Sequence, residues 1–256
     1  MPPPTTRVMA VLAGLFALAL PHAAAPAEAA PPAGYYDAAA GLSGERLKDA
    51  LHGIISTGTA SITYKQAWNA LKVTDEDPAR PGSVILLYSG ISRSKDQNGG
   101  DPGDWNREHV WPQSHGPFDT GTTPGTDLHH LRPEDVTVNR IRGNKDFDNG
   151  GSPVPEAPGN RSDKDSWEPR DAVKGDVARM VFYMAVRYEG GTDLEVDESG
   201  THSGNPRLGR LSVLLAWHRQ DPVDAFERRR NDIIFERYQH NRNPFIDHPE
   251  WVAAIF

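Results

Sequence analysis

Apolar residues recur at helical spacing in several stretches of this chain, and each stretch predicts an amphipathic helix. These stretches are Tyr35–Gly58, Ser61–Leu71, Val173–Tyr188, Leu208–Trp217 and Asp224–Gln239. Ser43 precedes the apolar positions of the first stretch and is a suitable N-cap. Val173–Tyr188 has a long apolar face, so we expect it to form the central core helix.

Strand signals are fewer than helix signals. Val84–Tyr88 is a continuous apolar run bounded by Pro81-Gly82 and Ser89-Gly90, which is typical of a buried strand. There is no internal repeat, and the length suits one domain with a sizeable core. The pattern therefore predicts a single, mixed α+β domain that is rich in helix.

Polar side chains that can carry protons or bind metals crowd between Asp104 and Asn144. This region predicts a short strand, a Gly/Pro/Thr-rich loop, a second short strand and a helix that begins at Pro133 and stops at Gly143. The expected bounds of the first three parts are Arg107–Pro112, Gln113–Thr126 and Asp127–Leu131. Such a unit is compact enough to bring His109 and Asn139 to one point.

The residue types in this unit indicate a reaction. The imidazole of His109 is a natural general base near neutral pH. Glu108 and Asn139 offer hard oxygen ligands that suit Mg²⁺, with Mn²⁺ or Ca²⁺ as alternatives, and Arg142 can clamp a phosphate. No His/Cys set has zinc spacing, which argues against a zinc protease. The set fits metal-assisted phosphodiester hydrolysis.

Each of these residues also has a plainer interpretation. Asn139 alone is a weak signal, because an Asn within a helix usually faces solvent. Arg142 is either a surface residue or a partner of Asp146 across the helix end. Neighbours on a regular strand point to opposite faces, so Glu108 and His109 can meet one phosphate only through a twist, a bulge or the strand end.

The N-terminus has the features of a secretory signal peptide. Arg7 supplies a positive charge, Val8–Leu20 is apolar, and small residues surround Ala25. The apolar run is short for a membrane span, although an N-terminal anchor is the alternative. The boundaries expected from this pattern are 1–25 for the signal peptide, 26–32 for a Pro/Ala-rich linker and 33–256 for the folded domain. We therefore expect a secreted protein, extracellular or periplasmic, with no membrane attachment after signal removal.

Composition adds one difficulty. There are 27 basic and 35 acidic residues, a formal charge of −8, and removing residues 1–32 removes Arg7 and Glu28 together. This balance is unfavourable for a nucleic-acid-binding protein unless basic residues cluster locally or cations assist. The strongest basic cluster is Arg228, Arg229 and Arg230. It is either a phosphate-backbone contact or a solvated face paired with neighbouring acids. The chain has no Cys, so disulfides are excluded.

Two motifs in order, REHVWPQS and TDLHHLRPEDVTVNRIRGN, resemble the bacterial endonuclease I family of secreted or periplasmic nucleases. Further segments near the start, in the middle and at the end extend the resemblance over nearly the whole mature chain. The resemblance implies a ββα-metal (His-Me finger) active site embedded in the domain. It implies that His109 is the general base, that Glu108 and Asn139 are the metal ligands, and that Arg142 lies near the scissile phosphate.

The same resemblance extends to residues around this set. Asp127 and His129 match positions expected to support the site without touching the substrate, and His130 matches less closely. A dense polar segment, residues 240–251, resembles a family motif that we interpret as a structural clamp. The implied activity is largely sequence-non-specific hydrolysis of DNA, with RNA as a second candidate substrate, using one Mg²⁺. The alternatives are a phosphoesterase for small substrates and an inactive nucleic-acid-binding relative. A monomer is the simplest expectation.

Overall fold

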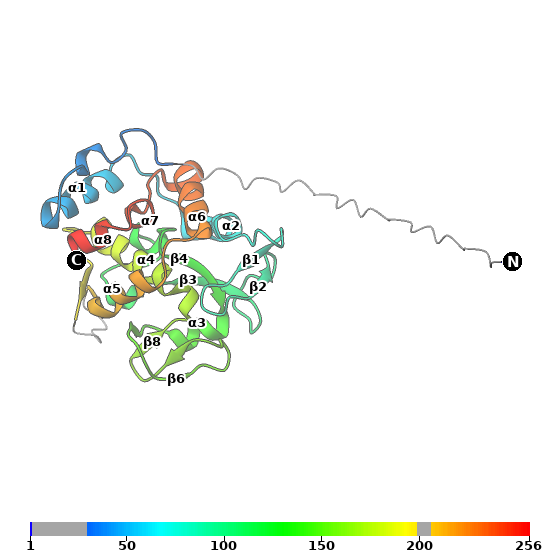
Figure 1. Cartoon of the computed structure of the whole chain (residues 1–256). Helices are drawn as coiled ribbons and strands as arrows, with labels where there is room; N and C mark the ends of the chain where they lie inside the picture. Colours follow the sequence, from blue (N-terminus) through cyan, green and yellow to red (C-terminus); the bar gives the residue numbers. More distant parts are fainter. Residues whose placement is uncertain (2–29, 199–205) are drawn as a thin grey trace.

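The helix expected at the centre of the core is α4 (Lys174–Arg187), and all but its last residue are buried. In the computed structural model, which describes residues 1, 30–198 and 206–256, α4 contacts α1 (Gly44–Ser56) and α5 (Leu211–Gln220). These helices lie together on one side of the molecule (Figure 1). The apolar face that the sequence pattern indicated is thus enclosed by helices from both ends of the chain.

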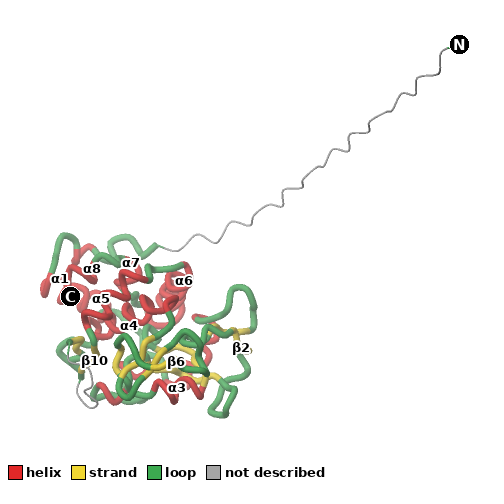
Figure 2. The backbone as a smooth tube through the Cα atoms, turned by 60° about the horizontal axis from the view of Figure 1, so that its bottom comes forward, coloured by secondary structure: helices red, strands yellow, loops and turns green. Residues whose placement is uncertain are grey.

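Helices and short strands share one compact domain, as the sequence predicted. The remaining α-helices are α2 (Tyr64–Thr74), α3 (Val136–Arg142), α6 (Ala225–Ile234), α7 (Pro244–Asp247) and α8 (Trp251–Ile255). Short 3₁₀ turns lie at Asp37–Ala39, Gln113–His115, Pro124–Thr126 and Asp171–Val173, and a π-helical turn at Phe235–Gln239. The strands gather beside the helical part rather than between its helices (Figure 2).

The strands form small separate sheets. Their bounds are β1 (Ser83–Ile85), β2 (Ser92–Ser94), β3 (Trp105–His109), β4 (Leu131–Asp135), β5 (Asp146–Phe147), β6 (Ser152–Pro153), β7 (Arg161–Ser162), β8 (Ser166–Glu168), β9 (Glu195–Asp197) and β10 (Arg207–Gly209). Three sheets are pairs: β1 with β2, β3 with β4, and β9 with β10. The fourth has the order β5-β8-β7-β6. The β3–β4 pair matters most below, because it runs directly into α3.

Several predicted element boundaries move by a few residues. Helix α2 begins at Tyr64 rather than Ser61, because Thr63 and Gln66 form a capping box at its start. Helix α5 begins at Leu211, since Leu208 belongs to β10. In the apolar run Val84–Tyr88 every residue but the half-buried Ile85 is buried, and its pairing with β2 ends at Ile85. Helix α6 is capped by Asp224 and ends at Ile234, whereas the predicted stretch ran from Asp224 to Gln239.

A buried network of ion pairs joins the helical part to the β3–β4 pair. The Nε atom of Arg132, on β4, lies 2.6 Å from Asp75 at the end of α2, and Arg230 of α6 lies 3.2 Å from the same carboxylate. On α4, Arg179 binds Glu227 of α6 at 2.6 Å. In a protein without Cys, such fully paired internal charges fix how the elements sit relative to one another.

The segment predicted to be a structural clamp is tied into the fold in the same way. Arg242 lies 2.7 Å from both Asp232 and Asp247. Asn241 donates to the carbonyl of Ile55 at 3.0 Å and to the hydroxyl of Tyr183 at 2.8 Å. The C-terminal part of the chain therefore closes over α1 and α4.

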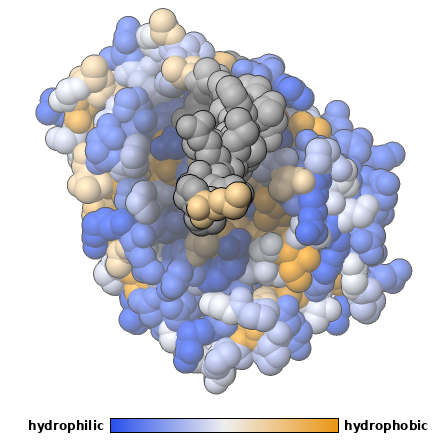
Figure 3. Space-filling model, turned by 45° about the vertical axis from the view of Figure 1, so that its right-hand side comes forward, coloured by the Kyte–Doolittle hydropathy of each residue, from blue (hydrophilic) through white to orange (hydrophobic). Residues whose placement is uncertain are grey.

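The surface turned forward in Figure 3 is mostly hydrophilic, with apolar side chains in small separate groups. Among the described residues, no helix is both long enough and apolar enough to cross a membrane. The predicted signal peptide and most of the predicted linker fall within residues 2–29, outside the described part of the chain.

Candidate active site

The candidate site is built on β3, β4 and α3. The antiparallel register pairs Glu108 with Arg132 and His109 with Leu131. The order strand, loop, strand, helix is the one expected from the sequence, but the bounds of both strands were wrong. The first strand begins at Trp105 and ends at His109, and the second begins at Leu131 rather than Asp127.

The predicted helix start at Pro133 was also wrong, because Pro133, Glu134 and Asp135 belong to β4. The carboxylate of Asp135 accepts from the backbone N–H groups of Thr137 at 2.7 Å and Val138 at 3.1 Å. This N-cap outweighs the preference of Pro for a first helical turn. Helix α3 therefore starts directly after β4, and Gly143 ends it at a φ of 60°, as predicted.

Glu108 is 2 % exposed and is held by two donors. The hydroxyl of Tyr88 donates to its Oε1 at 2.8 Å, and Nη1 of Arg142 lies 3.4 Å from the same atom. Burial raises the pKa of Glu108 to about 7, against the lowering effects of Arg142 and Tyr88. Both donors act on Oε1, so Oε2 is left to meet another ligand.

His109 has a defined tautomer in this setting. Its Nε2 lies 3.0 Å from the carbonyl oxygen of Gly125, which can only accept, so Nε2 carries the proton. The lone pair is then on Nδ1, and the side-chain nitrogen of Gln113 lies beside the ring, 3.4 Å from Nδ1 and 3.1 Å from Nε2. Burial, followed by the nearby His130, lowers the pKa of His109 to about 3. The imidazole is thus neutral at neutral pH, which leaves the lone pair on Nδ1 free.

Gly125 cannot carry a larger side chain in this backbone. A Cβ built there would lie 1.9 Å from the carbonyl oxygen of Asp119. The close approach lets the 3₁₀ turn Pro124–Thr126 fold back, and its carbonyl then faces His109. The orientation of His109, at the end of β3, thus depends on a glycine in a separate turn.

Asn139 projects from α3, and a neighbour on β3 orients its amide. Its Nδ2 donates to Oδ1 of Asn106 at 2.8 Å. Because the nitrogen is engaged in this way, Oδ1 is the atom presented to the other side. The sequence analysis did not identify Asn106, although its position two residues before Glu108 places it on the same face of the strand.

A pocket of about 230 Å³ brings these residues together. It is lined by Arg107, Glu108, His109, Pro112, Gln113, Ser114, Asn139, Gly143 and Asn144. The pocket lies at the end of β3, where side chains from both faces of the strand can reach one space. Glu108 and His109 can therefore line the same pocket although they are neighbours on a strand. The carboxylate of Glu108 and the amide oxygen of Asn139 are hard donors that fit a cation such as Mg²⁺.

Arg142 occupies a different position from the one expected. It is 0 % exposed and does not line the pocket. Its guanidinium donates to the carbonyl oxygens of His109 at 3.1 Å and Val110 at 2.8 Å, and it lies over the ring of Phe147 at 4.7 Å. These contacts hold the end of β3 and the side chain of Glu108 in place. Neither a surface position nor a pairing with Asp146 describes it.

Asp127 and His129 lie behind the site, among the helices. Asp127 accepts from the hydroxyls of Tyr183 and Tyr188, both at 2.8 Å, and its pKa is lowered although burial acts to raise it. His129 packs on Tyr183 with ring centroids 4.4 Å apart. The two residues thus anchor the turn before β4 to α4, without a contact to the pocket.

His130 lies closer to the base than His129 does. Its ring centroid is 5.5 Å from that of His109. Its Nε2 lies 2.7 Å from the carbonyl oxygen of Pro124, and Nδ1 accepts from the N–H of Trp111 at 3.3 Å. His130 therefore ties the Pro124–Thr126 turn, which orients His109, to the segment after β3. Sequence spacing alone gave no reason to prefer it over His129.

The arginine cluster on α6 does not reach the pocket. Arg230 is 5 % exposed and donates to the carbonyl oxygens of Leu128 at 2.5 Å and Leu131 at 2.6 Å. Arg229 donates to the carbonyls of Val73 and Glu76, each at 3.3 Å, and Arg228 donates to that of Val223 at 3.1 Å. In the structure, all three side chains hold protein segments together.

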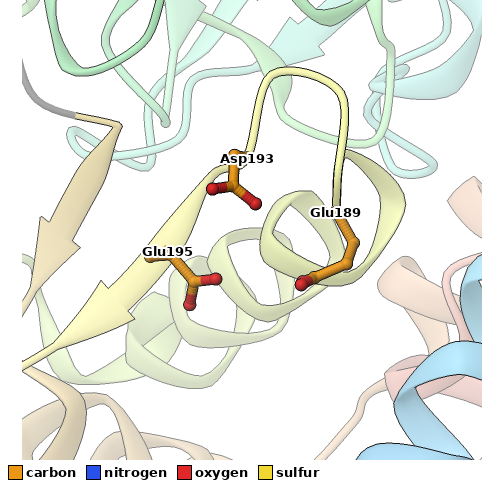
Figure 4. Close-up of side chains that lie close together, drawn as sticks. All are labelled: Glu189, Asp193 and Glu195. Atoms are coloured by element: carbon orange, nitrogen blue, oxygen red, sulfur yellow. The ribbon is translucent and has the colours of Figure 1, made fainter.

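An acidic cluster lies elsewhere, where α4 leads into β9. The carboxylates of Glu189, Asp193 and Glu195 lie near one another (Figure 4) and within 4.8 Å. Lys48 forms an ion pair with Glu189 and lies 3.8 Å from Glu195. The cluster is thus partly neutralised by a cation of the protein itself.

Comparison with known proteins identifies the family of the chain. A model of the endonuclease I family matches residues 43–250. An extracellular ribonuclease of Bacillus amyloliquefaciens is 65 % identical over 225 residues, which are 87 % of this chain and 78 % of that protein. An extracellular ribonuclease of Bacillus subtilis (strain 168) is 62 % identical with the same coverage of both chains. The chain belongs to the endonuclease I family and is a nuclease, a hydrolase of phosphodiester bonds.

Proposed function

We propose that this protein is a secreted, divalent-cation-dependent endonuclease, largely non-specific for sequence, that cleaves both RNA and DNA. The observation that carries the proposal is the pocket in which His109, Glu108 and Asn139 meet. The names of the two Bacillus relatives, both extracellular ribonucleases, favour RNA as a substrate and an extracellular location. The apolar N-terminal segment of the sequence also favours export.

In this proposal, His109 is the general base. Its Nδ1 takes a proton from a water molecule, while the carbonyl of Gly125 keeps the opposite nitrogen protonated and fixes the ring. Gln113 lines the same pocket, with its amide nitrogen 3.4 Å from Nδ1 and 3.1 Å from Nε2, and we assign it to orienting that water. Because water rather than the ribose 2′-hydroxyl is the nucleophile, the same site can act on RNA and on DNA.

Glu108 and Asn139 would hold the cation, which we propose to be Mg²⁺. When bound, it would supply charge stabilisation at the phosphate and at the leaving oxygen. The protein's own contribution is to fix its two ligand atoms. Tyr88 and Arg142 hold Oε1 of Glu108, and Asn106 holds Nδ2 of Asn139, so each ligand offers its remaining oxygen.

The test is cleavage of a labelled RNA and of plasmid DNA by the purified protein, with Mg²⁺ and with EDTA, beside His109→Ala. We expect both substrates to be cut only with the cation, and the variant to lose at least about a hundredfold in rate. The RNA products should lack 2′,3′-cyclic phosphates. Cleavage of RNA through cyclic phosphates, or full activity in the variant, would contradict the proposal.

The alternatives predict other results in the same assay. A small-substrate phosphoesterase would hydrolyse nitrophenyl phosphates or nucleotides and leave both polymers intact. An inactive binding relative would show a melting shift with nucleic acid and no product at any cation concentration.

A further inference from the structure

Arg107 is the one Lys or Arg among the residues that line the pocket. It lies on β3 two residues before His109, so both side chains leave the strand on the same face. Arg142, the other arginine close to His109, is buried and bound to backbone carbonyls. The pocket thus has a single cationic side chain in its wall, beside the proposed base.

Two aromatic rings of α2 hold this side chain. The guanidinium carbon of Arg107 lies 3.4 Å from the ring centroid of Tyr64 and 4.1 Å from that of Trp68. Nη1 also donates to the carbonyl oxygen of Tyr64 at 2.5 Å. Tyr64 and Trp68 are four residues apart, on one face of the helix. Stacking on aromatic rings restricts a guanidinium without neutralising its charge.

The charge of Arg107 has no carboxylate partner among the residues that the structure describes. Its Nη2 forms no hydrogen bond to those residues, and its Nε is shielded from solvent without an acceptor. A partly buried cation is normally paired with an anion. An oriented guanidinium with unused donors, in the wall of a pocket, is suited to bind a planar arrangement of two anionic oxygens.

We propose that Arg107 binds a phosphate of the nucleic-acid backbone in the His109 pocket, and that α2, through Tyr64 and Trp68, is part of the substrate-binding site. Tyr64 also stacks on His109, with ring centroids 5.6 Å apart and an angle of 27° between the planes. One tyrosine ring therefore sets the spacing between the base and the phosphate-binding cation. This inference rests on the proposal that the pocket is the active site.

The test uses binding of a fluorescent RNA oligonucleotide over a range of salt concentrations, in the full chain carrying His109→Ala. Arg107→Met should weaken binding about tenfold and make the slope of log K against log salt shallower by about one. Arg107→Lys should restore the slope but only part of the affinity, because an ammonium lacks the guanidinium fork. Arg161→Met is the matched control, since Arg161 also lies on a strand and donates to one backbone carbonyl, at 2.6 Å, but does not line the pocket.

Cleavage assays separate this inference from the function on which it rests. In the chain with His109 intact, Arg107→Met should raise KM more than it lowers kcat, at an unchanged melting temperature. An unchanged salt slope in Arg107→Met, with or without loss of affinity, would overturn the assignment and leave at most a structural role. If His109→Ala is inactive while Arg107→Met behaves like Arg161→Met, the nuclease site stands and only the role of Arg107 fails. If His109→Ala cleaves normally, the site itself is wrong.

Discussion

At the scale of single residues, burial separates two arginines that lie close to His109 in the structure. Arg107 and Arg142 both lie close to His109, and both are of the type that binds phosphate. Arg142 is enclosed and its donors meet carbonyl oxygens and Glu108, whereas Arg107 lines the pocket without a carboxylate partner among the described residues. Arg142 is thus placed to position other residues of the site, whereas Arg107 is placed to contact the substrate.

We expect Arg142→Met to be strongly destabilising, by about 3 to 5 kcal/mol, because Glu108 would remain buried without its charged partner. Two backbone carbonyls would also lose their donor. The measurement is urea unfolding followed by tryptophan fluorescence, with Arg161→Met as the control. A variant as stable as the parent, with only a raised KM, would show instead that Arg142 touches the substrate.

The chemistry of the site could be predicted from sequence, but its contacts could not. His109, Glu108 and Asn139 were identifiable because few side chains can act as a base or as hard ligands, and the structure brings all three to one pocket. Asn106, Gln113 and Tyr64 were not identified, since an amide or an aromatic ring serves equally well in a surface or a core. Only the packing of β3 against its neighbours shows that these side chains lie beside His109, Glu108 and Asn139.

At the scale of elements, the junction between β4 and α3 controls the position of Asn139. The sequence predicted the order of elements correctly and placed this junction too early, because Pro133 resembles a helix start. The deciding contacts are those of the Asp135 side chain with the first N–H groups of α3. Pro133 and Asp135 are both possible helix starts in the sequence. Only the backbone geometry decides between them, and residue spacing does not give that geometry.

Asp135→Ala should therefore destabilise the protein by about 1 to 2 kcal/mol and lower nuclease activity, since the N-cap of the helix that carries Asn139 is lost. Asp135→Asn is the control that keeps a capping oxygen while losing the ion pair with Arg93 at 2.6 Å. The melting temperature and the cleavage rate should both be highest in the parent, intermediate in Asp135→Asn and lowest in Asp135→Ala. Equal behaviour of the two variants would indicate that the ion pair, rather than the cap, is what matters.

At the scale of the whole molecule, buried histidines link stability to pH. Burial is the largest cause that lowers the pKa of His129, His130 and His218 from 6.5 to about 4. As pH falls from about 6.5 to about 4, these three histidines are protonated in the unfolded chain before they are protonated in the folded one. The stability that depends on their being neutral is therefore complete above pH 6.5 and declines below it. Glu227 acts in the opposite direction, because burial raises its pKa to about 8. Its contribution to folding stability declines as pH rises from 4.5 towards 8.

The contribution of one histidine can be isolated by difference. His218 lies far along the chain from the proposed site, with Nε2 3.0 Å from the carbonyl of Pro249 and Arg179 as its charged neighbour. Relative to the parent, His218→Gln should gain stability as pH falls from about 6.5 to about 4, because glutamine takes up no proton. The measurement is urea unfolding at several pH values, with exposed His240→Asn as the control for removal of an imidazole from the surface. A His218→Gln curve that is parallel to that of the parent would contradict the linkage.

The direct continuation of β4 into α3 has a consequence for recombining members of this family. Since no loop separates Asp135 from Val136, any residue inserted there would rotate Asn139 about the helix axis and away from Glu108. The Pro124–Thr126 turn, which fixes the tautomer of His109, lies between the two strands. Chimaeras should therefore exchange the region from Trp105 to Asn144 as one uninterrupted block, with crossover points in the surface turns outside it.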